Sequence, residues 1–495
     1  MLAVHLRIND AATGQPTAVR LRITGPEGAV YPPHGRFSDF PTGRNEDVGG
    51  RVRVGDENWY YTDGSCEVRL PAGVPLRVRA TKGPEYLPLD TTVTLGPGQM
   101  ALRYSVERWS DVRAGGWHPA DARCHFLPPH AALLEAAAED LDVVNLLACV
   151  QHYPSQDGML YPTVPHLAAF SGQSPALEAG GRAVVVNTLN VHPTLGRVGL
   201  LNSHRPVFPL TAGGSDATDD WSVCDWCDQC HRKGGLVVWV EPFRPAGGLV
   251  GGEALVAAVL GKIDAIESDG RAGGQPFLPW VYRLWNAGFP IPLVGASGKD
   301  GNRVALGAVR TYAHTPHLPF SYPGWVGAVC AGRTVVTNGP LISLDVDGVG
   351  PGGTVATDGN AICIRATATS SIPFERMDLV ADGVVVATAT ATRATHWSAT
   401  IELAHTPLTA GWVAVRAAGV AHPPGGAVFA HSSPVLVRVT GRPRPSHPAA
   451  VADLIRLVGD TREWVERYGR FENPKRKQTL LDRTADAVVR LKAGG

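Results

Sequence analysis

The stretch of sequence that decides the architecture of this chain is Trp117-His118-Pro119-Ala120-Asp121-Ala122-Arg123-Cys124-His125. Its spacing matches an Asp-x-His-x-His strand end that holds metal ions, but Arg123 stands at the position of the first histidine. A guanidinium is permanently charged and has no lone pair to donate, so Arg123 cannot ligate a cation. The stretch therefore indicates the frame of a metal site with a fixed positive charge in one of its ligand positions.

Around this stretch, residues 106 to 330 alternate between predicted helices and short apolar strands. Four predicted helices each precede a strand: 131–141 and 143–147, 224–233 and 236–240, 252–260 and 263–266, 277–287 and 291–294. Repetition of strand, helix and strand implies parallel strands, and therefore an α/β barrel or an open sheet. In both architectures the chemistry lies at the carboxyl ends of the strands.

Residues 1–105 predict an all-β unit. Short runs that alternate apolar and polar residues, such as 66–70 and 75–80, are separated by Gly, Pro and Asp. This part resembles a small β-sandwich of the carboxypeptidase-regulatory type.

Residues 331–440 predict a second β-sandwich. Asp382-Gly383, directly before a run of valines, is typical of a hairpin turn followed by a strand. Residues 446–495 predict a tail of two helices that pack back onto the barrel or the sandwich. Apolar residues recur there at i, i+4 and i+7 in two sets: Val451, Ile455 and Val458, then Leu481, Ala485 and Val488. The sequence thus predicts a multidomain α/β plus all-β protein.

The charge balance and cysteine content narrow the classes of partner and compartment. The chain of 495 residues has 45 Lys+Arg and 45 Asp+Glu, so no overall field attracts nucleic acid or anionic lipid. No apolar run reaches the roughly 18 residues of a membrane helix, and no export signal is visible. Eight cysteines in a chain this long do not indicate a disulfide framework. We expect a cytoplasmic protein whose ligand is an unidentified small molecule.

Five segments, taken in order and spacing, resemble one known family. They are 116–143, 195–202, 234–242, 261–267 and 332–340. The chain resembles the CehA/McbA-type (carbaryl-hydrolase-like) metallohydrolases, which carry a PHP (polymerase and histidinol phosphatase) domain. The resemblance runs from about residue 105 to 440. It implies a distorted (β/α)7 barrel that holds divalent metals and hydrolyses esters, carbamates or phosphoesters.

The ligand set that this family implies is largely replaced here. Asp121 and His125 remain, whereas the later Gly-His pair is Gly196-Arg197 and the His-Pro pair is Glu241-Pro242. The other substituted positions hold neutral residues or lie near an acidic one: Asn187 or Asn190 for the upstream acidic ligand, and Ser297, with Asp300 three residues on, for the closing aspartate.

Two hypotheses follow for the site. In the first, the protein is a catalytically degenerate hydrolase in which Arg123 and Arg197 pair with Asp121 and Glu241, while a pocket is kept for binding or lost. Two fixed positive charges would repel a divalent cation by several kcal/mol at short range. In the second, Asp121, His125 and Glu241 hold a single zinc or manganese ion whose bound water attacks an ester, carbamate or phosphoester. A variant of the second uses a shifted site with His192 or His204.

Three cysteines, Cys224, Cys227 and Cys230, lie on one face of a predicted helix at i, i+3 and i+6. Buried thiols pack there as small apolar groups, whereas a zinc or iron–sulfur site would need a further ligand from elsewhere. Asp219-Asp220 just before this helix predicts N-terminal capping rather than a catalytic dyad.

Two features allow other functions. Arg310 in a late strand could bind an anionic group of a substrate or make a structural ion pair. The two β-sandwiches could bind glycan or a protein partner, with the barrel as a scaffold. An aromatic platform on one sandwich face would indicate that function.

Overall fold

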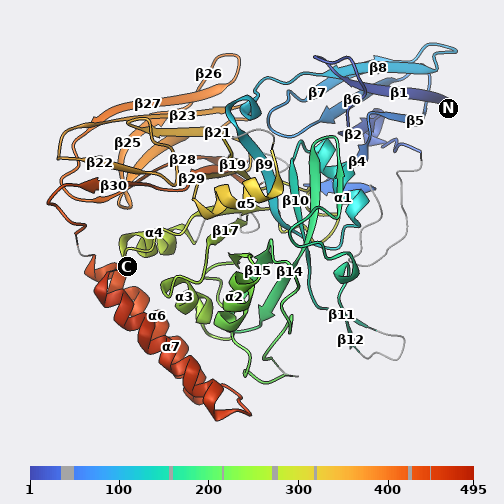
Figure 1. Cartoon of the computed structure of the whole chain (residues 1–495). Helices are drawn as coiled ribbons and strands as arrows, with labels where there is room; N and C mark the ends of the chain where they lie inside the picture. The colour runs from blue at the N-terminus through green and yellow to red at the C-terminus, as the bar shows by residue number, and fades with distance from the viewer. Residues whose placement is uncertain are drawn as a thin grey trace.

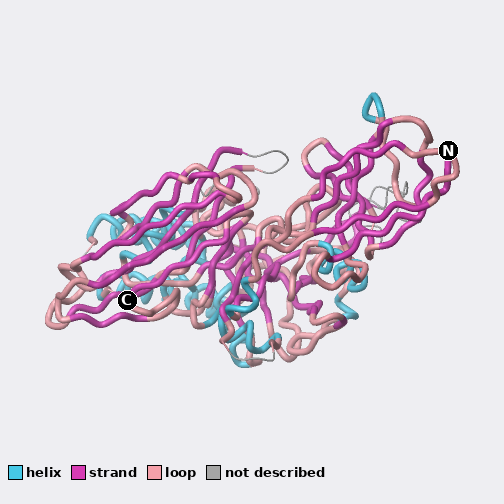
Figure 2. Tube along the Cα trace, turned by 90° about the horizontal axis from the view of Figure 1, so that it is seen from above, coloured by secondary structure: helices cyan, strands magenta, loops and turns pink. Residues whose placement is uncertain are grey.

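The computed structural model describes residues 1–34, 50–154, 160–214, 217–269, 277–316, 320–421, 426–445 and 447–494. Two β-rich parts lie at opposite ends of the molecule, with an α/β part between them and a pair of long helices along one side (Figure 1). The view from above shows the same two groups of strands flanking the central part (Figure 2). The multidomain, β-rich character that the sequence predicts is confirmed.

The N-terminal part consists of two sheets, β5-β1-β8 and β3-β4-β2-β6-β7. Its strands are β1 (Leu2–Asp10), β2 (Val19–Thr24), β3 (Arg51–Val54), β4 (Glu57–Thr62), β5 (Ser65–Leu70), β6 (Pro75–Thr81), β7 (Leu89–Thr94) and β8 (Ala101–Val106). Alternate residues of a strand point to opposite faces, so Leu6 of β1 and Val78 of β6 meet in a common core.

The α/β part begins with β9, the strand that carries the decisive stretch. Its elements are β9 (Trp117–Cys124), α1 (Pro129–Ala138), β10 (Val143–Ala148), β11 (Gln151–Pro154), β12 (Leu160–Thr163), β13 (Leu177–Ala179), β14 (Arg182–His192), β15 (Gly196–Leu201), α2 (Val223–Arg232), β16 (Leu236–Val240), α3 (Gly252–Val259), β17 (Ala265–Asp269), α4 (Leu278–Asn286), β18 (Leu293–Ala296), β19 (Arg310–His314) and α5 (Tyr322–Cys330). The four predicted helix–strand pairs are all present.

The central strands follow the order β18-β17-β16-β15-β14-β10-β9. β9, β10 and β14 are parallel, as are β16, β17 and β18, whereas β15 is antiparallel to both of its neighbours. Among the described residues these ladders form no closed barrel. The chain after β18 nevertheless returns beside β9: Lys299 forms a parallel bridge with Cys124, and the backbone N–H of His125 donates to the Lys299 carbonyl at 2.7 Å.

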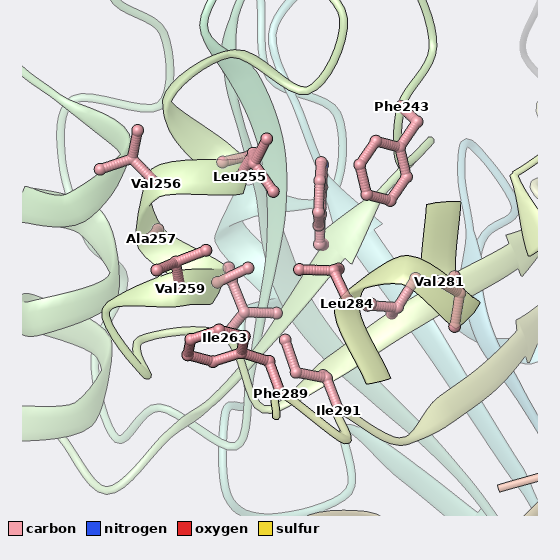
Figure 3. Packing of buried hydrophobic residues seen from close by; sticks show 14 of the residues in the cluster. Phe243, Leu255, Val256, Ala257, Val259, Ile263, Val281, Leu284, Phe289 and Ile291 are labelled. Atoms are coloured by element: carbon pink, nitrogen blue, oxygen red, sulfur yellow. The ribbon is translucent and has the colours of Figure 1, made fainter. Parts of the chain in front are cut away.

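Helices α3 and α4 cover one side of this sheet with a large apolar cluster. Figure 3 shows Leu255 and Val259 of α3 and Leu284 of α4 gathered with Phe289 and Ile291 around one centre. All five side chains are buried. This packing holds the helices outside the sheet and leaves the carboxyl ends of the strands for polar residues.

The C-terminal β-part is two-layered, with β21-β23-β27-β26 facing β20-β29-β28-β24-β25 across a shared core. Its strands are β20 (Thr334–Thr337), β21 (Leu341–Val346), β22 (Thr354–Thr357), β23 (Ile362–Ser370), β24 (Arg376–Ala381), β25 (Val384–Thr390), β26 (Thr392–Arg393), β27 (Trp397–His405), β28 (Gly411–Ala421), β29 (Ala427–Ser432) and β30 (Val435–Val439). β20 pairs with β19 on one side and β29 on the other, so hydrogen bonding runs without a break past residue 330.

The two predicted tail helices are α6 (Pro448–Arg467) and α7 (Pro474–Ala493). Both pack against the large apolar cluster to which α3 and α4 contribute. The predicted apolar seam of α7 is confirmed at Leu481 and Val488, which pack against this cluster, and is wrong at Ala485. Leu480, Thr484 and Ala487 are buried there, whereas Ala485 is exposed. Thr484 tolerates burial because its hydroxyl donates to the Leu481 carbonyl at 2.6 Å. None of the helices in the described ranges is long and apolar enough to cross a membrane.

Asp140, just after α1, holds the segment that connects β8 to β9. Its carboxylate is almost fully buried and accepts from Arg108 at 2.8 Å and Arg113 at 2.9 Å. Burial alone would raise the pKa of Asp140, but the surrounding cations, Arg113 first, hold this pKa well below its ordinary value. Asp140 also has a positive φ of 56°, which Asn tolerates as well as Asp.

We therefore predict that Asp140→Asn lowers the free energy of unfolding at pH 7 by about 3 kcal/mol, because it removes a buried carboxylate and leaves Arg108 and Arg113 only Glu85 and Asp142 as counter-charges. The folded pKa lies below the unfolded value of about 3.9. The stabilisation is therefore present above about pH 4 and is lost as the pH falls toward the folded pKa. Urea denaturation of both proteins at pH 7 and pH 3 should show the difference narrowing at pH 3; an equal difference at both values would contradict this role.

Candidate functional site

The carboxyl ends of β9, β16 and β17 lie close together at one end of the central sheet, a place that we call the mouth. They carry Arg123 and His125, Glu241, and Glu267, and the adjacent start of β15 brings Arg197 to the same place. These residues are distant in sequence but converge because parallel strands end on the same side of their sheet.

Arg123 and Glu267 form a bidentate ion pair inside this mouth. Nε of Arg123 donates to Oε2 of Glu267 and Nη2 donates to Oε1, both at 2.7 Å. The two side chains are 4% and 0% exposed, so the pair is removed from water. Fork-to-fork pairing of this kind combines charge attraction with two aligned hydrogen bonds.

His125 is engaged from both sides of its ring. Its Nδ1 lies 2.9 Å from the Leu147 carbonyl, which only accepts, so Nδ1 carries the proton. Nε2 lies 3.2 Å from Nη1 of Arg123 and accepts from it. The lone pair that a metal would need from this imidazole is therefore directed at a guanidinium.

Glu241, directly after β16, lies between two further arginines. Its Oε2 accepts from Nη1 of Arg197 at 2.7 Å and from Nη1 of Arg244 at 2.8 Å. Burial would raise the pKa of Glu241, but these arginines together with Arg123 hold it below its usual value. The carboxylate is 7% exposed whereas the two arginines are 40% and 64% exposed, so the cationic groups face outward.

Asp121 does not pair with an arginine, which corrects one part of the predicted network. Its Oδ1 accepts the backbone N–H of Arg123 at 3.1 Å and of Ser297 at 3.0 Å, and its Oδ2 accepts that of Gly307 at 2.8 Å. Burial raises the pKa of Asp121. Asp121 therefore fastens the end of β9 to the end of β18 and to the loop before β19, and Arg123 pairs with Glu267 instead.

Three other candidate residues form hydrogen bonds outside the set of Arg123, His125, Arg197, Glu241 and Glu267. Asn187 donates to the Tyr322 hydroxyl of α5 at 3.2 Å, and Asn190 donates to the carbonyls of Val207 and Pro209. Arg310 donates to the backbone carbonyl of Glu139 at 2.9 Å, near the carboxyl end of α1. All three side chains are buried, so their contacts hold the fold together.

The two candidates after β18 lie in the loop that returns beside β9. Ser297 presents its N–H to Asp121, and its hydroxyl accepts the N–H of Lys299 at 3.1 Å. Asp300 is half-buried in the same loop. Ser297 thus shapes the return of the chain.

The histidines considered for a shifted site also have partners. Nε2 of His192 donates to Asp219 at 2.9 Å, because Nδ1 accepts the backbone N–H of Leu195 at 3.0 Å. His204 is exposed and its Nδ1 lies 2.9 Å from the Lys233 carbonyl. Neither ring nitrogen of His192 is open to a metal.

The predicted capping role of Asp219-Asp220 is wrong. Ser222 is the N-cap of α2 and forms a capping box with Asp225. Asp219 instead accepts hydrogen bonds from His192 and from the backbone N–H of Arg470. Asp220 accepts the backbone N–H groups of Glu472 and Asn473. The loop before α2 thus binds the C-terminal tail.

Cys224, Cys227 and Cys230 lie in the large apolar cluster, and each is fully buried. Burial raises the pKa of all three thiols, so they are protonated at neutral pH, whereas metal binding requires the thiolate. Glu253 adds to the capping by Ser222, since it accepts the backbone N–H groups of Val223 and Cys224 at the start of α2.

The donor set at the mouth does not suit a metal ion. Asp121 is committed to backbone amides, His125 to Arg123, and Glu241 to two arginines. Across the ranges that the structure describes, no three His, Cys, Asp or Glu side chains are grouped as metal ligands.

Beside Glu241 lies a cavity of about 150 Å³. Its polar lining includes His192, Arg197, Glu241 and Arg244, with Phe243 on the apolar side. Two of these residues, Arg244 and Phe243, were not predicted from the sequence, and neither was Glu267 in the mouth. Glu267 comes directly after the apolar run predicted as a strand, 263–266, which is the signal that could have identified it.

Comparison of the chain with protein-family models, curated proteins and solved structures finds no match.

We predict that Arg123→Met and Glu267→Leu, taken singly, each lower the free energy of unfolding by about 3–5 kcal/mol, because each leaves an unpaired charge in a buried place. The double variant should recover most of this loss, since both charges are then absent. A double-mutant cycle in urea measures the coupling. Additive losses in the double variant would show that the two side chains do not stabilise each other.

Proposed function

We propose that this protein is a catalytically degenerate relative of the CehA/McbA-type metallohydrolases, with a PHP-like barrel whose mouth binds a small anion without metal. The order of seven strands from β9 to β18, together with the Lys299–Cys124 bridge between the two ends, supports a distorted barrel. The observation that carries the functional proposal is the Arg123–Glu267 fork with His125 bound to its outer nitrogen.

The charges explain why metal is replaced rather than merely lost. In this family's sites a cation would neutralise the carboxylates at the strand ends. Here Arg123 neutralises Glu267, and Arg197 and Arg244 over-neutralise Glu241. A divalent ion would meet three guanidinium groups, whose repulsion at short range is worth several kcal/mol.

The same charges favour an anion in the adjacent cavity. Arg197 and Arg244 share a single carboxylate oxygen, which leaves one net positive charge on partly exposed guanidinium groups. A volume of about 150 Å³ corresponds to about five water molecules, enough for a phosphate or carboxylate head group. Guanidinium forks suit both groups.

We predict that orthophosphate binds the purified protein equally well in EDTA and in excess zinc. Arg244→Gln should weaken this binding about tenfold or more, because one charge-assisted hydrogen bond is worth about 1.5–3 kcal/mol. Isothermal titration calorimetry measures both effects. Arg365→Gln is the matched control. Arg365 is an exposed arginine of β23 whose carboxylate partner, Glu402, lies 3.8 Å away.

Either of two results would overturn the proposal. Binding that appears only with zinc, together with hydrolysis of a phosphoester or carboxylester, would indicate a working metal centre. Phosphate binding that Arg244→Gln and Arg365→Gln leave equally unchanged would remove the cavity beside Glu241 as the anion site.

A further inference from the structure

A second cavity, of about 350 Å³, lies between the start of α4 and the sheet formed by β24, β28 and β29. Leu278, Pro279 and Tyr282 of α4 form one wall, and residues of the three strands form the other. In Figure 1, α4 lies beside the C-terminal sheet. The lining of this second cavity shares no residue with that of the cavity beside Glu241.

The strand register places two rows of side chains on the sheet face that α4 covers. Asp378, Arg416 and His431 stand directly opposite one another on β24, β28 and β29. Two residues along each strand, Arg376, Ala418 and Phe429 form the next row. Because side chains alternate between faces with a period of two, both rows point the same way.

The first row is internally satisfied. Asp378, which is 3% exposed, accepts from the Thr388 hydroxyl at 2.9 Å and from Nε of Arg416 at 3.1 Å. His431 donates from Nδ1 to the Ser432 carbonyl, so its Nε2 accepts the Tyr282 hydroxyl at 2.7 Å. Burial lowers the pKa of His431 to about 4, so this ring is neutral.

Charge in the cavity is not balanced. Arg376 and Arg416 face a single carboxylate, Asp378, which leaves one net positive charge. Nη2 of Arg416 lies 3.0 Å from Oδ2 of Asp378, whereas Nε of Arg376 lies 3.4 Å from the same oxygen. The contact with Asp378 is the only ion pair of Arg376 among the described residues. The Arg376 side chain is 52% exposed at the rim, beside an apolar floor made by Ala418 and Phe429.

We propose that this cavity binds an organic carboxylate with a flat apolar body. The carboxylate would pair with Arg376 and Arg416, and the body would lie on Ala418 and Phe429 against Leu278. One net positive charge matches a monoanionic carboxylate better than a phosphate dianion, and a guanidinium fork matches carboxylate geometry. The volume lies in the range of small-molecule sites, which combine apolar walls with a few polar groups.

The test uses the full chain and two aromatic carboxylates, 3-phenylpropanoate and 2-naphthoate, each beside its neutral amide. Titration calorimetry, with ligand-observed NMR for weak binding, gives the affinities. We expect at least one carboxylate to bind and its amide to bind at least tenfold more weakly. Arg376→Gln should weaken carboxylate binding at least tenfold, since this half-exposed side chain is not needed to hold Asp378.

Two further variants separate binding from folding. Ala418→Met fills the floor without altering charge and should abolish binding, with thermal melting used to verify that the variant is folded. Arg365→Gln removes an exposed arginine from the other sheet and should leave binding unchanged. Failure of both carboxylates to bind the wild-type protein would overturn the proposal. Carboxylate binding that survives both Arg376→Gln and Ala418→Met would also overturn the proposal. Each of these two results would leave the two rows of side chains with only a structural role, that of joining α4 to the sheet.

Discussion

The buried ion pair between Arg123 and Glu267 is the interaction on which the mouth of the central sheet depends. A carboxylate with no exposed surface is stable as an anion only beside a cation or a metal. Here the cation, Arg123, comes from within the chain. Once Arg123 is fixed by Glu267, it also occupies the free nitrogen of His125, so the remaining ligand of the stretch is committed to the same guanidinium.

The other acidic residues of the region then take structural roles. Asp121 fastens β9 to the chain that follows β18, which brings the two ends of the strand series together. Asp140, just after α1, neutralises Arg108 and Arg113, which lie in the segment between β8 and β9. Glu241 is 7% exposed, and its two arginine partners face the solvent.

Local periodicity was enough to predict most elements of the fold. The helix–strand pairs from 131 to 294 follow from apolar runs and glycine stops, and β16 has the predicted bounds. The seam of α7 was wrong at Ala485 because a buried threonine, Thr484, satisfies its hydroxyl within the helix and so behaves as an apolar residue. The continuity of the sheet through β20 was also missed, since strand pairing across residue 330 depends on tertiary contacts.

The site was predictable only in part, for a related reason. The family resemblance pointed to Arg123, His125, Arg197 and Glu241, and the structure brings these four to one mouth. The partner of Arg123 could not be predicted. Glu267 lies 144 residues from Arg123 in the sequence, and Arg123 was expected to pair with Asp121 instead. Backbone amides from two distant loops compete for Asp121, and no sequence pattern signals them.

The claim that guanidinium groups have replaced metal at this mouth is tested most directly by metal content. The protein would be purified without chelator or affinity nickel, incubated with excess zinc or manganese, desalted and measured by inductively coupled plasma mass spectrometry. We predict well below one equivalent of metal, unchanged in His125→Ala and Glu241→Ala. One equivalent that both variants lose, and that a triple Cys→Ala variant at 224, 227 and 230 keeps, would contradict the replacement and identify the mouth as a metal centre.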